Sequence, residues 1–274
     1  MRTRSTERDT GTGAYYDRLS GWTALARLLG YGGGRHALTV HRALADPRAR
    51  GHPTSTRIHD LLLDALPFAT FGRVLDAGCG MGGTMLALAA KCSATFTGLT
   101  LSPRQAEIGR RAIARGGLVD RIEILVQSYD DPPDRMFDAA IAIESLAHSA
   151  APCTSLSTIA ARIAPRGWLA LVDDVPETAA RGTADLAAFQ AGWRLPVLCG
   201  AAEISAALRE NDLTIVADHD LSSEISPRTP VQIARLERLN RALRNAAAGG
   251  LANPIVSMTL GCNLGQMGDA QYLA

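Results

Sequence analysis

The sequence predicts an α/β protein whose central parallel sheet is covered by helices on both faces. Between residues 73 and 173, short apolar runs alternate with stretches of helical periodicity, which is the pattern of consecutive βαβ units. The first apolar run ends in a glycine-rich turn, Gly78 to Gly83, of the kind that lets a backbone approach a ligand closely. A chain of 274 residues suffices for one large domain with a small lid.

The N-terminal part is expected to form a helical arm. Residues 1–13 have the polar composition of a tail that stays disordered until something binds. The three- and four-residue spacing of apolar side chains then predicts a helix from Tyr15 to Leu29, followed by helices at 35–45 and 54–66. We therefore divide the chain into a tail and helical lid over residues 1–67 and a core over residues 68–274.

The core is expected to contain five parallel strands, at residues 73–77, 94–99, 121–127, 137–143 and 168–173, with helices at 83–91, 103–114 and 155–163. Beyond Pro176 we expect a helical insertion or cap, with helices at 183–191, 201–211 and 229–248, a strand at 213–218 and a short last strand near 270–274. Parallel strands place ligands at their carboxyl ends. The arm and the cap are therefore expected to cover that edge as a lid.

Composition narrows the class of partner. Lys and Arg number 28 against 27 for Asp and Glu, a net charge of +1, which gives no electrostatic case for nucleic acid or an anionic membrane surface. The 5 cysteines lack metal-ligand spacing, so neither a disulfide framework nor a metal site is indicated. There is no apolar leader and no segment long enough to insert into a membrane. We expect a soluble, cytoplasmic protein with a small-molecule substrate. A homo-oligomer is compatible with the sequence, which does not decide whether the C-terminus is native or truncated.

The glycine turn follows a strand and opens a helix, and Gly78-x-Gly80-x-x-Gly83 matches the dinucleotide-binding fingerprint literally. Its neighbours separate the two cofactor classes. Asp76 stands two residues before the first glycine, where the dinucleotide fingerprint usually has an apolar residue. Thr100, at the end of the second strand, offers no carboxylate to an NAD ribose.

Together these residues resemble the first motif of class I S-adenosyl-L-methionine (SAM)-dependent methyltransferases, which implies a Rossmann-like sheet, a helical N-terminal lid and SAM as cofactor. The run Gly98-Leu-Thr-Leu-Ser-Pro-Arg-Gln105 resembles a segment of tocopherol methyltransferases and cyclopropane-fatty-acid synthases. Its Ser102-Pro103 pair is also a standard helix start. The resemblance, which covers residues 15–175, implies cofactor contacts from Tyr16, Asp76, Gly78, Gly80, Gly82, Thr100, Leu101, Gln105, Gln127, Ser128 and Ile143.

Residues 142–149, Ala-Ile-Glu-Ser-Leu-Ala-His-Ser, resemble the Ala-Ile-Glu-Ala-Thr-Cys-His-Ala segment of sterol C-24 methyltransferases. Tyr15-Tyr16-Asp17 is similar to their Tyr-Tyr-Asn opening, and geranyl diphosphate C-methyltransferases also have a Glu after the fourth strand. The resemblance implies Glu144 and His148 as catalytic residues. The alternatives are a salt bridge or hydrogen bond to the lid for Glu144, and helix capping or adenine-side packing for His148.

The resulting hypothesis is a C-methyltransferase of specialised metabolism that methylates an alkene carbon of an isoprenoid or terpenoid, through a carbocation that is then deprotonated. We expect Tyr15, Trp22, Tyr31 and Arg35 to contact the substrate. Basic residues between positions 35 and 50 would either bind a phosphate or form a solvated face. Residues 30–36 replace the Tyr/Trp-rich substrate segment of sterol enzymes, which argues against a sterol. The alternatives are an O- or N-methyltransferase of a phenolic or polyketide-like molecule and a non-catalytic SAM-binding module.

Overall fold

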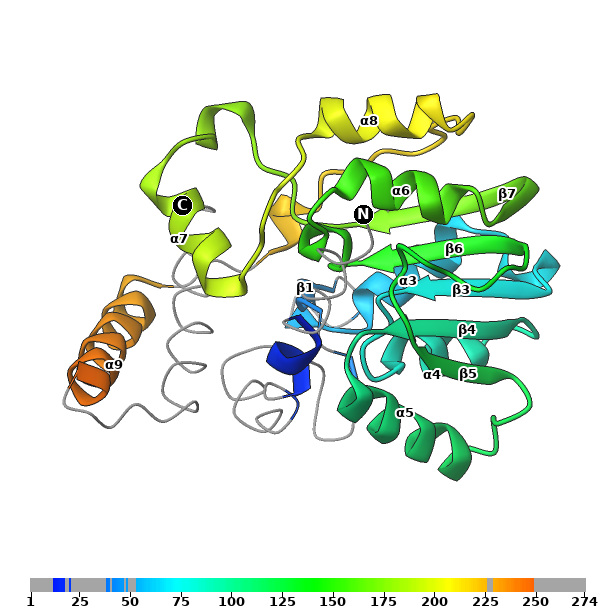
Figure 1. Ribbon diagram of the computed structural model, residues 1–274, viewed down its shortest axis with the longest axis horizontal. Coiled ribbons are helices and arrows are strands. Elements are labelled where there is room, and N and C mark those ends of the chain that lie inside the picture. Colours follow the sequence, from blue (N-terminus) through cyan, green and yellow to red (C-terminus); the bar gives the residue numbers. More distant parts are fainter. Residues whose placement is uncertain are drawn as a thin grey trace.

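The computed structural model describes residues 12–17, 20, 38–39, 41–46, 48, 53–225 and 229–248. Its centre is a sheet of five parallel strands in the order β5-β4-β3-β6-β7 (Figure 1). The strands are β3 (Arg73–Ala77), β4 (Thr95–Thr100), β5 (Ile122–Val126), β6 (Phe137–Ile143) and β7 (Ile163–Val172). The chain runs outward from β3 through β4 to β5 and then returns to the other side of β3 with β6. The carboxyl ends of β3 and β6 therefore form the switch point at which open α/β sheets bind ligands.

Helices cover both faces of the sheet, as predicted. On one face lie α3 (Arg57–Ala65), α4 (Gly83–Ala89) and α5 (Pro103–Arg115); on the other lies α6 (Pro152–Ala160), with α8 (Ala201–Glu210) packed on its outer side (Figure 1). The α5 helix begins at Pro103 because the Ser102 hydroxyl accepts a hydrogen bond from the Gln105 backbone N–H (3.1 Å). This confirms the helix start that was predicted from the Ser102-Pro103 pair.

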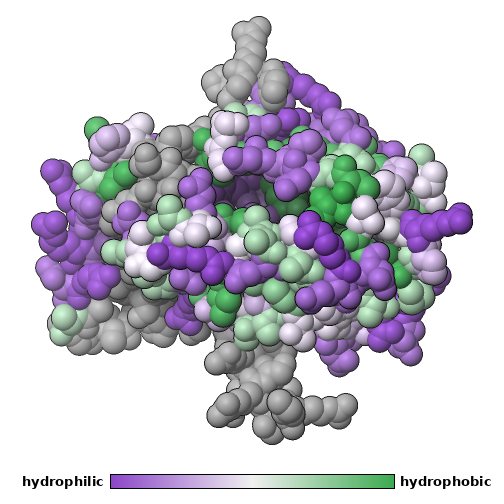
Figure 2. All heavy atoms as spheres, turned by 90° about the horizontal axis from the view of Figure 1, so that it is seen from above, coloured by the Kyte–Doolittle hydropathy of each residue, from purple (hydrophilic) through white to green (hydrophobic). Residues whose placement is uncertain are grey.

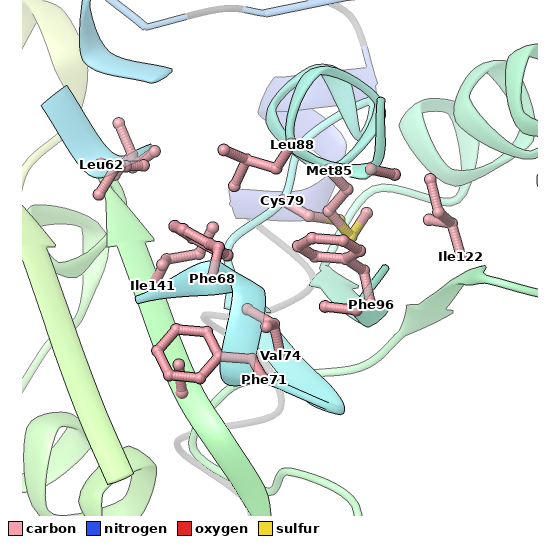
Figure 3. Close-up of a cluster of buried hydrophobic side chains, with 14 of the residues drawn as sticks. Leu62, Phe68, Phe71, Val74, Cys79, Met85, Leu88, Phe96, Ile122 and Ile141 are labelled. Atoms are coloured by element: carbon pink, nitrogen blue, oxygen red, sulfur yellow. The ribbon is translucent and has the colours of Figure 1, made fainter. Parts of the chain in front are cut away.

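The core is built from apolar side chains on both faces of the strands. Figure 3 shows the larger cluster, in which side chains from β3, β4 and β6 meet those of α3 and α4; it includes Leu62, Val74, Met85, Leu88, Phe96 and Ile141. A second cluster on the opposite face contains Leu75, Leu99, Phe137 and Ile159. Burial of both faces explains why the strands are nearly continuous apolar runs. The packed sheet gives the residues at its carboxyl edge a rigid base.

Two predicted elements are wrong. In the described part of the helix expected over 35–45, Leu44–Ala45 forms strand β1, which pairs antiparallel with β2 (Pro53–Thr54). The Asp46 carboxylate accepts hydrogen bonds from the Arg48 backbone N–H (2.8 Å) and the Thr54 hydroxyl (3.3 Å), and such a turn competes with a helix. The strand expected at 213–218 is irregular, and Val216 is 72% exposed. No strand pairs with this segment among the described residues.

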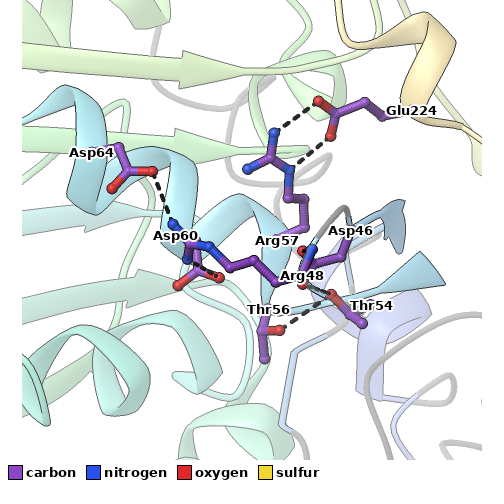
Figure 4. A network of polar contacts seen from close by, with 8 residues as sticks. All are labelled: Asp46, Arg48, Thr54, Thr56, Arg57, Asp60, Asp64 and Glu224. Carbon is purple, nitrogen blue, oxygen red and sulfur yellow. Dashed lines mark hydrogen bonds and ion pairs between the residues drawn. The ribbon is translucent and has the colours of Figure 1, made fainter. Parts of the chain in front are cut away.

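Ion pairs attach the segments around β1 and η5 (Ser222–Glu224) to α3 (Figure 4). The Arg57 guanidinium donates two 2.9 Å hydrogen bonds to the Glu224 carboxylate. Arg48 lies 2.9 Å from the Asp60 carboxylate. These contacts fix the described end of the arm against the helical face of the core.

The remaining helices are α7 (Ala184–Trp193), α9 (Pro230–Ala248) and the 3₁₀ turns η2 (Phe68–Thr70), η3 (Leu146–His148) and η4 (Thr178–Ala180). Helices α7 and α9 lie beyond the carboxyl ends of the strands (Figure 1). Residues 12–17 are helical. This agrees with the first predicted helix at residues 15–17, but residues 12 and 13 belong to the segment that was predicted to be a disordered tail. Most of that helix and the strand predicted near 270–274 lie outside the described residues. Within the described chain, no helix is both long enough and apolar enough to cross a bilayer.

Candidate active site

A cavity of about 830 Å³ lies at the carboxyl ends of the strands. Its walls come from the ends of β3, β4, β6 and β7 and from residues 193–196 at the end of α7. The arm contributes Thr12, Tyr15, Tyr16, Leu38, Thr39, His41 and Arg42. Viewed from the α8 side, the surface is hollowed between the sheet and the α7 region, with hydrophilic side chains around much of the opening (Figure 2). All the predicted cofactor residues except Gly82 line this cavity.

The glycine turn is shaped by three left-handed backbone positions, with φ of 96° at Gly78, 54° at Gly80 and 78° at Gly82. A Cβ at Gly78 would lie 2.4 Å from the Cβ of Ser145, so this glycine allows close packing. A Cβ at Gly80 would meet nothing nearer than the Gln105 side chain at 4.0 Å. Gly80 therefore leaves space inside the cavity, whereas Gly82 is the N-cap residue of α4 and is absent from the cavity lining.

Asp76, the acid that precedes the turn, is 3% exposed. Burial raises the pKa of its carboxyl to about 7, and its Oδ2 atom has no hydrogen-bond partner among the described residues. The Oγ1 atom of Thr39, on the arm side of the same cavity, is also buried without a hydrogen-bond partner among the described residues. Buried polar atoms of this kind are costly unless a ligand completes them. The Asp76 carboxyl and the Thr39 hydroxyl together fit a bound molecule with a positively charged, hydrogen-bonding end, such as the amino acid part of SAM.

Other predicted cofactor residues line the same cavity at the ends of β4 and β5. The Thr100 hydroxyl donates to Gln105 Oε1 (3.0 Å), so these two side chains form one polar wall. Gln127 and Ser128 follow β5, and the Ser128 hydroxyl accepts from the Asp130 backbone N–H (3.2 Å). The chain itself carries no carboxylate from Thr100 to Gln105, at the end of β4 where an NAD enzyme has the acid that binds its ribose.

Glu144 follows β6 directly and adopts φ 45°, a left-handed conformation that is strained for a residue with a side chain. Its backbone N–H donates to the Val172 carbonyl (2.7 Å), and its Oε1 accepts from the Arg42 backbone N–H (2.8 Å). Burial, together with the nearby Asp174 and Asp173 carboxylates, raises the pKa of Glu144 to about 8 against the opposing effect of Arg42. The carboxyl thus faces the cavity mostly protonated at neutral pH.

His148 lies at the end of η3, and its Nε2 atom is 2.5 Å from the Tyr16 hydroxyl. The two rings meet edge to face, with centroids 5.2 Å apart. Burial lowers the pKa of His148 to about 4, so the imidazole is neutral near pH 7 and can accept or donate a proton. Tyr16, predicted as a cofactor contact, therefore also contacts a predicted catalytic residue.

Of the predicted substrate residues, Tyr15 lines the cavity, and the Arg194 guanidinium lies 5.2 Å from its ring centroid. Trp22, Tyr31 and Arg35 lie outside the described residues. The described arginines of the basic segment, Arg42 and Arg48, both form ion pairs with carboxylates. In the described part of the arm, these pairs give no support to a basic phosphate-binding patch.

Sequence reasoning missed several residues of the site. Asp173 and Asp174 follow β7 and line the cavity, and Arg42 lies 3.2 Å from Asp174. Asp17 accepts hydrogen bonds from the Ser102 hydroxyl and the Arg104 backbone N–H, which anchors the arm at the start of α5. The two adjacent acids at the end of a buried strand were a usable signal, because carboxyl ends of parallel strands share one edge.

A glycine turn at the switch point of a doubly wound sheet, with an acid before it and no ribose carboxylate after the next strand, defines a Rossmann-like enzyme for a SAM-type cofactor. The chain belongs to the methyltransferase domain family, whose pattern matches residues 49–218. The curated relatives that it matches are methyltransferases as well.

Curated relatives include both C- and O-methyltransferases. The chain is 34% identical to 24-methylenesterol C-methyltransferase 2 of Oryza sativa subsp. japonica over 103 residues, which are 36% of this chain and 28% of that protein. It is 28% identical to O-methyltransferase rstn1 of Aspergillus nomiae over 151 residues, 54% of this chain and 67% of that protein. The chain thus spans between about a quarter and two thirds of these relatives.

Solved structures share the fold over nearly the whole chain. The [4+2]-cyclase SpnF matches with a TM-score of 0.72 at 22% identity, covering 96% of this chain and 92% of that one. A geranyl diphosphate methyltransferase, solved with geranyl diphosphate and sinefungin, matches with a TM-score of 0.67 at 18% identity, covering 94% of each chain. At these identities the likeness concerns the fold, and it confirms the predicted Rossmann-like sheet with helices on both faces.

Proposed function

We propose that this methyltransferase transfers the methyl group of SAM to an alkene carbon of an isoprenoid-like small molecule. The bound cofactor supplies an electrophilic methyl group on a sulfonium, so the protein has to align the acceptor and manage the charge that follows. Methylation of an alkene leaves a tertiary carbocation on the substrate. That cation needs aromatic faces or carboxylates close by and a base that removes a proton.

The observation that carries the proposal is the position of Glu144 at the switch point, between the glycine turn and the acids after β7. Glu144, Asp173 and Asp174 line the wall at the ends of β6 and β7, and aromatic side chains line other parts of the cavity, namely Tyr15, Tyr16, Tyr129 and Trp193. Carboxylates and electron-rich rings around one space are suited to a cationic species. They are poorly suited to an anionic acceptor.

Glu144 would serve as the final base. Its raised pKa of about 8 means that its ionised form is a stronger base than an ordinary carboxylate. A positive charge nearby favours that ionised form. The Arg42 N–H occupies Oε1, so Oε2 would accept the proton. Residues 12–16 and 193–196 border the same space, where they would exclude water that could otherwise quench the cation.

A second candidate, methylation of a hydroxyl oxygen, is favoured by the contact between His148 and Tyr16. A neutral imidazole beside a phenol can remove a proton from an acceptor hydroxyl as methyl transfer proceeds. The similarity to an O-methyltransferase over 54% of the chain supports the same alternative. In this case Glu144 would bind the arm and His148 would be the base.

Turnover with a substrate panel tests the proposal. Purified protein and SAM would be incubated with a prenyl alcohol, its diphosphate, a phenol and an amine, and S-adenosylhomocysteine and methylated products measured by mass spectrometry and NMR. We expect a new carbon–methyl bond on a prenyl compound. Glu144→Gln should lower this turnover about 10²–10⁴-fold and release misquenched alkenes or alcohols. Methylation of oxygen alone, lost in His148→Gln and kept in Glu144→Gln, would establish the second candidate instead.

A further inference from the structure

Two consecutive acids after β7, Asp173 and Asp174, contact the two segments that carry the candidate bases. We propose that they are positioning residues with separate tasks: Asp173 fixes the turn that carries His148, and Asp174 fixes the arm residue that holds Glu144. This inference rests on the proposed function only in treating Glu144 and His148 as the bases. The contacts themselves do not depend on the substrate.

Asp173 acts on η3. Its Oδ2 accepts a hydrogen bond from the Ala147 backbone N–H (3.0 Å), and the Leu146 N–H also bonds to this carboxylate. These are the first N–H groups of η3, which a residue at the N-cap normally satisfies. The N-cap residue Ser145 makes no such bond, because its hydroxyl donates to the Ala77 carbonyl (2.6 Å). Asp173 therefore caps the turn from the neighbouring strand and holds its last residue, His148, against Tyr16.

Asp174 acts on the arm. Its carboxylate oxygens lie 3.2 Å from the Arg42 guanidinium, whose side chain is only 14% exposed. The backbone N–H of the same Arg42 donates to Glu144 Oε1. The side chain of Arg42 thus binds Asp174 after β7, while its backbone N–H binds Glu144 after β6. Loss of the ion pair would remove the contact that attaches this residue to β7, and with it part of what fixes the N–H that binds Glu144.

The charges of the two acids have an effect on Glu144 that a purely structural role would not produce. Asp173 and Asp174 both raise the pKa of Glu144, whereas Arg42 lowers it. Neutralising either acid should therefore move the acidic limb of a Glu144-dependent pH profile downward. Only the loss of Asp174 should also disorder the Glu144 carboxyl. Only the loss of Asp173 should loosen the 146–148 turn.

Double-mutant cycles on turnover, measured as S-adenosylhomocysteine release, test the assignment. We expect Asp174→Asn to lower turnover that depends on Glu144, and Asp173→Asn to lower turnover that depends on His148. Each loss should be up to about 10²-fold, which is the effect of misplacing a catalytic group by about 1 Å. Asp174→Asn should be non-additive with Arg42→Met, and Asp173→Asn with His148→Gln, because each pair acts as a unit. Asp173→Asn combined with Arg42→Met should be additive. Asp120→Asn, an exposed acid after α5, is the matched control and should change nothing.

Amide hydrogen exchange on the free protein gives a readout that needs no substrate. Exchange at Ala147 should accelerate in Asp173→Asn and stay unchanged in Asp174→Asn, and exchange at Arg42 should show the reverse. Equal changes at both amides in both variants, or none, would overturn the separate assignment. If the exchange pattern holds while no panel compound is methylated on carbon, the positioning roles stand and only the proposed reaction is wrong.

Discussion

The Tyr16 hydroxyl and the Nε2 atom of His148 lie 2.5 Å apart, although the two residues are 132 positions apart in the chain. The arm thus contributes a polar group directly to the site. Its backbone is also close-packed there, since a Cβ at Gly13 would lie 2.4 Å from the Leu101 carbonyl oxygen at the end of β4. A complete cavity wall therefore requires the arm to be docked.

Docking of the arm should depend on Asp17, which accepts hydrogen bonds from the Ser102 hydroxyl and the Arg104 N–H. Asp17→Ala removes both bonds, so we expect faster hydrogen exchange at residues 12–17 and weaker S-adenosylhomocysteine binding. The loss should be roughly ten- to a hundredfold, because hydrogen bonds to a charged group contribute about 1.5–3 kcal/mol. Exchange in this segment should slow again when S-adenosylhomocysteine and substrate are added. The control is Glu107→Gln, which removes an exposed carboxylate from α5, the helix against which the arm is anchored. A ligand that leaves exchange of the arm unchanged would exclude its role as a lid.

Cofactor binding should be lost in Gly80→Val. The new side chain would project into the cavity, and φ of 54° adds a backbone cost of about 1–2 kcal/mol. Gly117→Val provides the matched control, because Gly117 also has a positive φ (67°) with no atom within 4 Å, but stands after α5 and outside the cavity lining. Calorimetry should show normal S-adenosylhomocysteine binding in the control and none in Gly80→Val, and no NAD binding to the wild type. Normal binding by a folded Gly80→Val protein would move the cofactor away from this turn.

Local patterns were sufficient to predict the sheet and the cofactor turn. The strand Phe137–Ile143 has the predicted bounds, and α9 begins at Pro230 as expected, because apolar periodicity and Pro or Ser start signals act over a few residues. Glu144 was predicted from the resemblance of residues 142–149 to a segment of sterol C-24 methyltransferases, and the structure places it directly after the buried strand β6. These predictions required no knowledge of how distant segments pack.

The structure of the arm, and the residues that hold the candidate bases in place, could not be predicted in this way. Leu44–Ala45 has a helix-compatible composition, yet it pairs with Pro53–Thr54 because Asp46 forms a turn between them. The segment 213–218 has strand-like residues but no described partner strand, and an unpaired backbone gains nothing from an extended conformation. Arg42 acts through its backbone N–H, a group that every residue except proline carries. This contact therefore leaves no trace in residue type, in contrast to the ion pair of the Arg42 guanidinium with Asp174.

Oxidation should join Cys153 and Cys199. Cys153 lies in the first turn of α6, Cys199 precedes α8, and their sulfur atoms are 3.7 Å apart. Burial, with a contribution from Cys153, raises the pKa of Cys199 to about 11, so the reaction should be slow at neutral pH. A low-molecular-weight disulfide would accept the two electrons and two protons of the thiols and leave as two free thiols. Non-reducing peptide mapping should find this link, and Cys153→Ser should prevent it. A different intramolecular link, or none after prolonged oxidation, would contradict the placement of the two elements.

SAM affinity should depend on pH more steeply than S-adenosylhomocysteine affinity. SAM carries a sulfonium charge that S-adenosylhomocysteine lacks, and Glu144 is mostly protonated below its pKa of about 8. A cation beside this carboxyl favours the ionised form. Binding of SAM near pH 7 should therefore release a proton, and its affinity should rise with pH until about pH 8 and then level off, by at most about tenfold per pH unit.

The sign of this dependence follows from the raised pKa. The free protein holds a proton on Glu144 between its ordinary pKa of 4.5 and about 8, and the cation-bound form releases it in that range. Asp76, whose pKa is about 7, is expected to act equally on both ligands through the amino acid part that they share, so it cancels in the ratio of the two affinities. Asp173 also has a pKa near 7. Its contribution to the pH dependence is measured by repeating the titration in Asp173→Asn. Calorimetry in buffers of different ionisation enthalpy would count the protons. Glu144→Gln should make the ratio independent of pH; an unchanged slope in that variant would show that Glu144 does not sense the sulfonium, and the final base would have to be sought elsewhere.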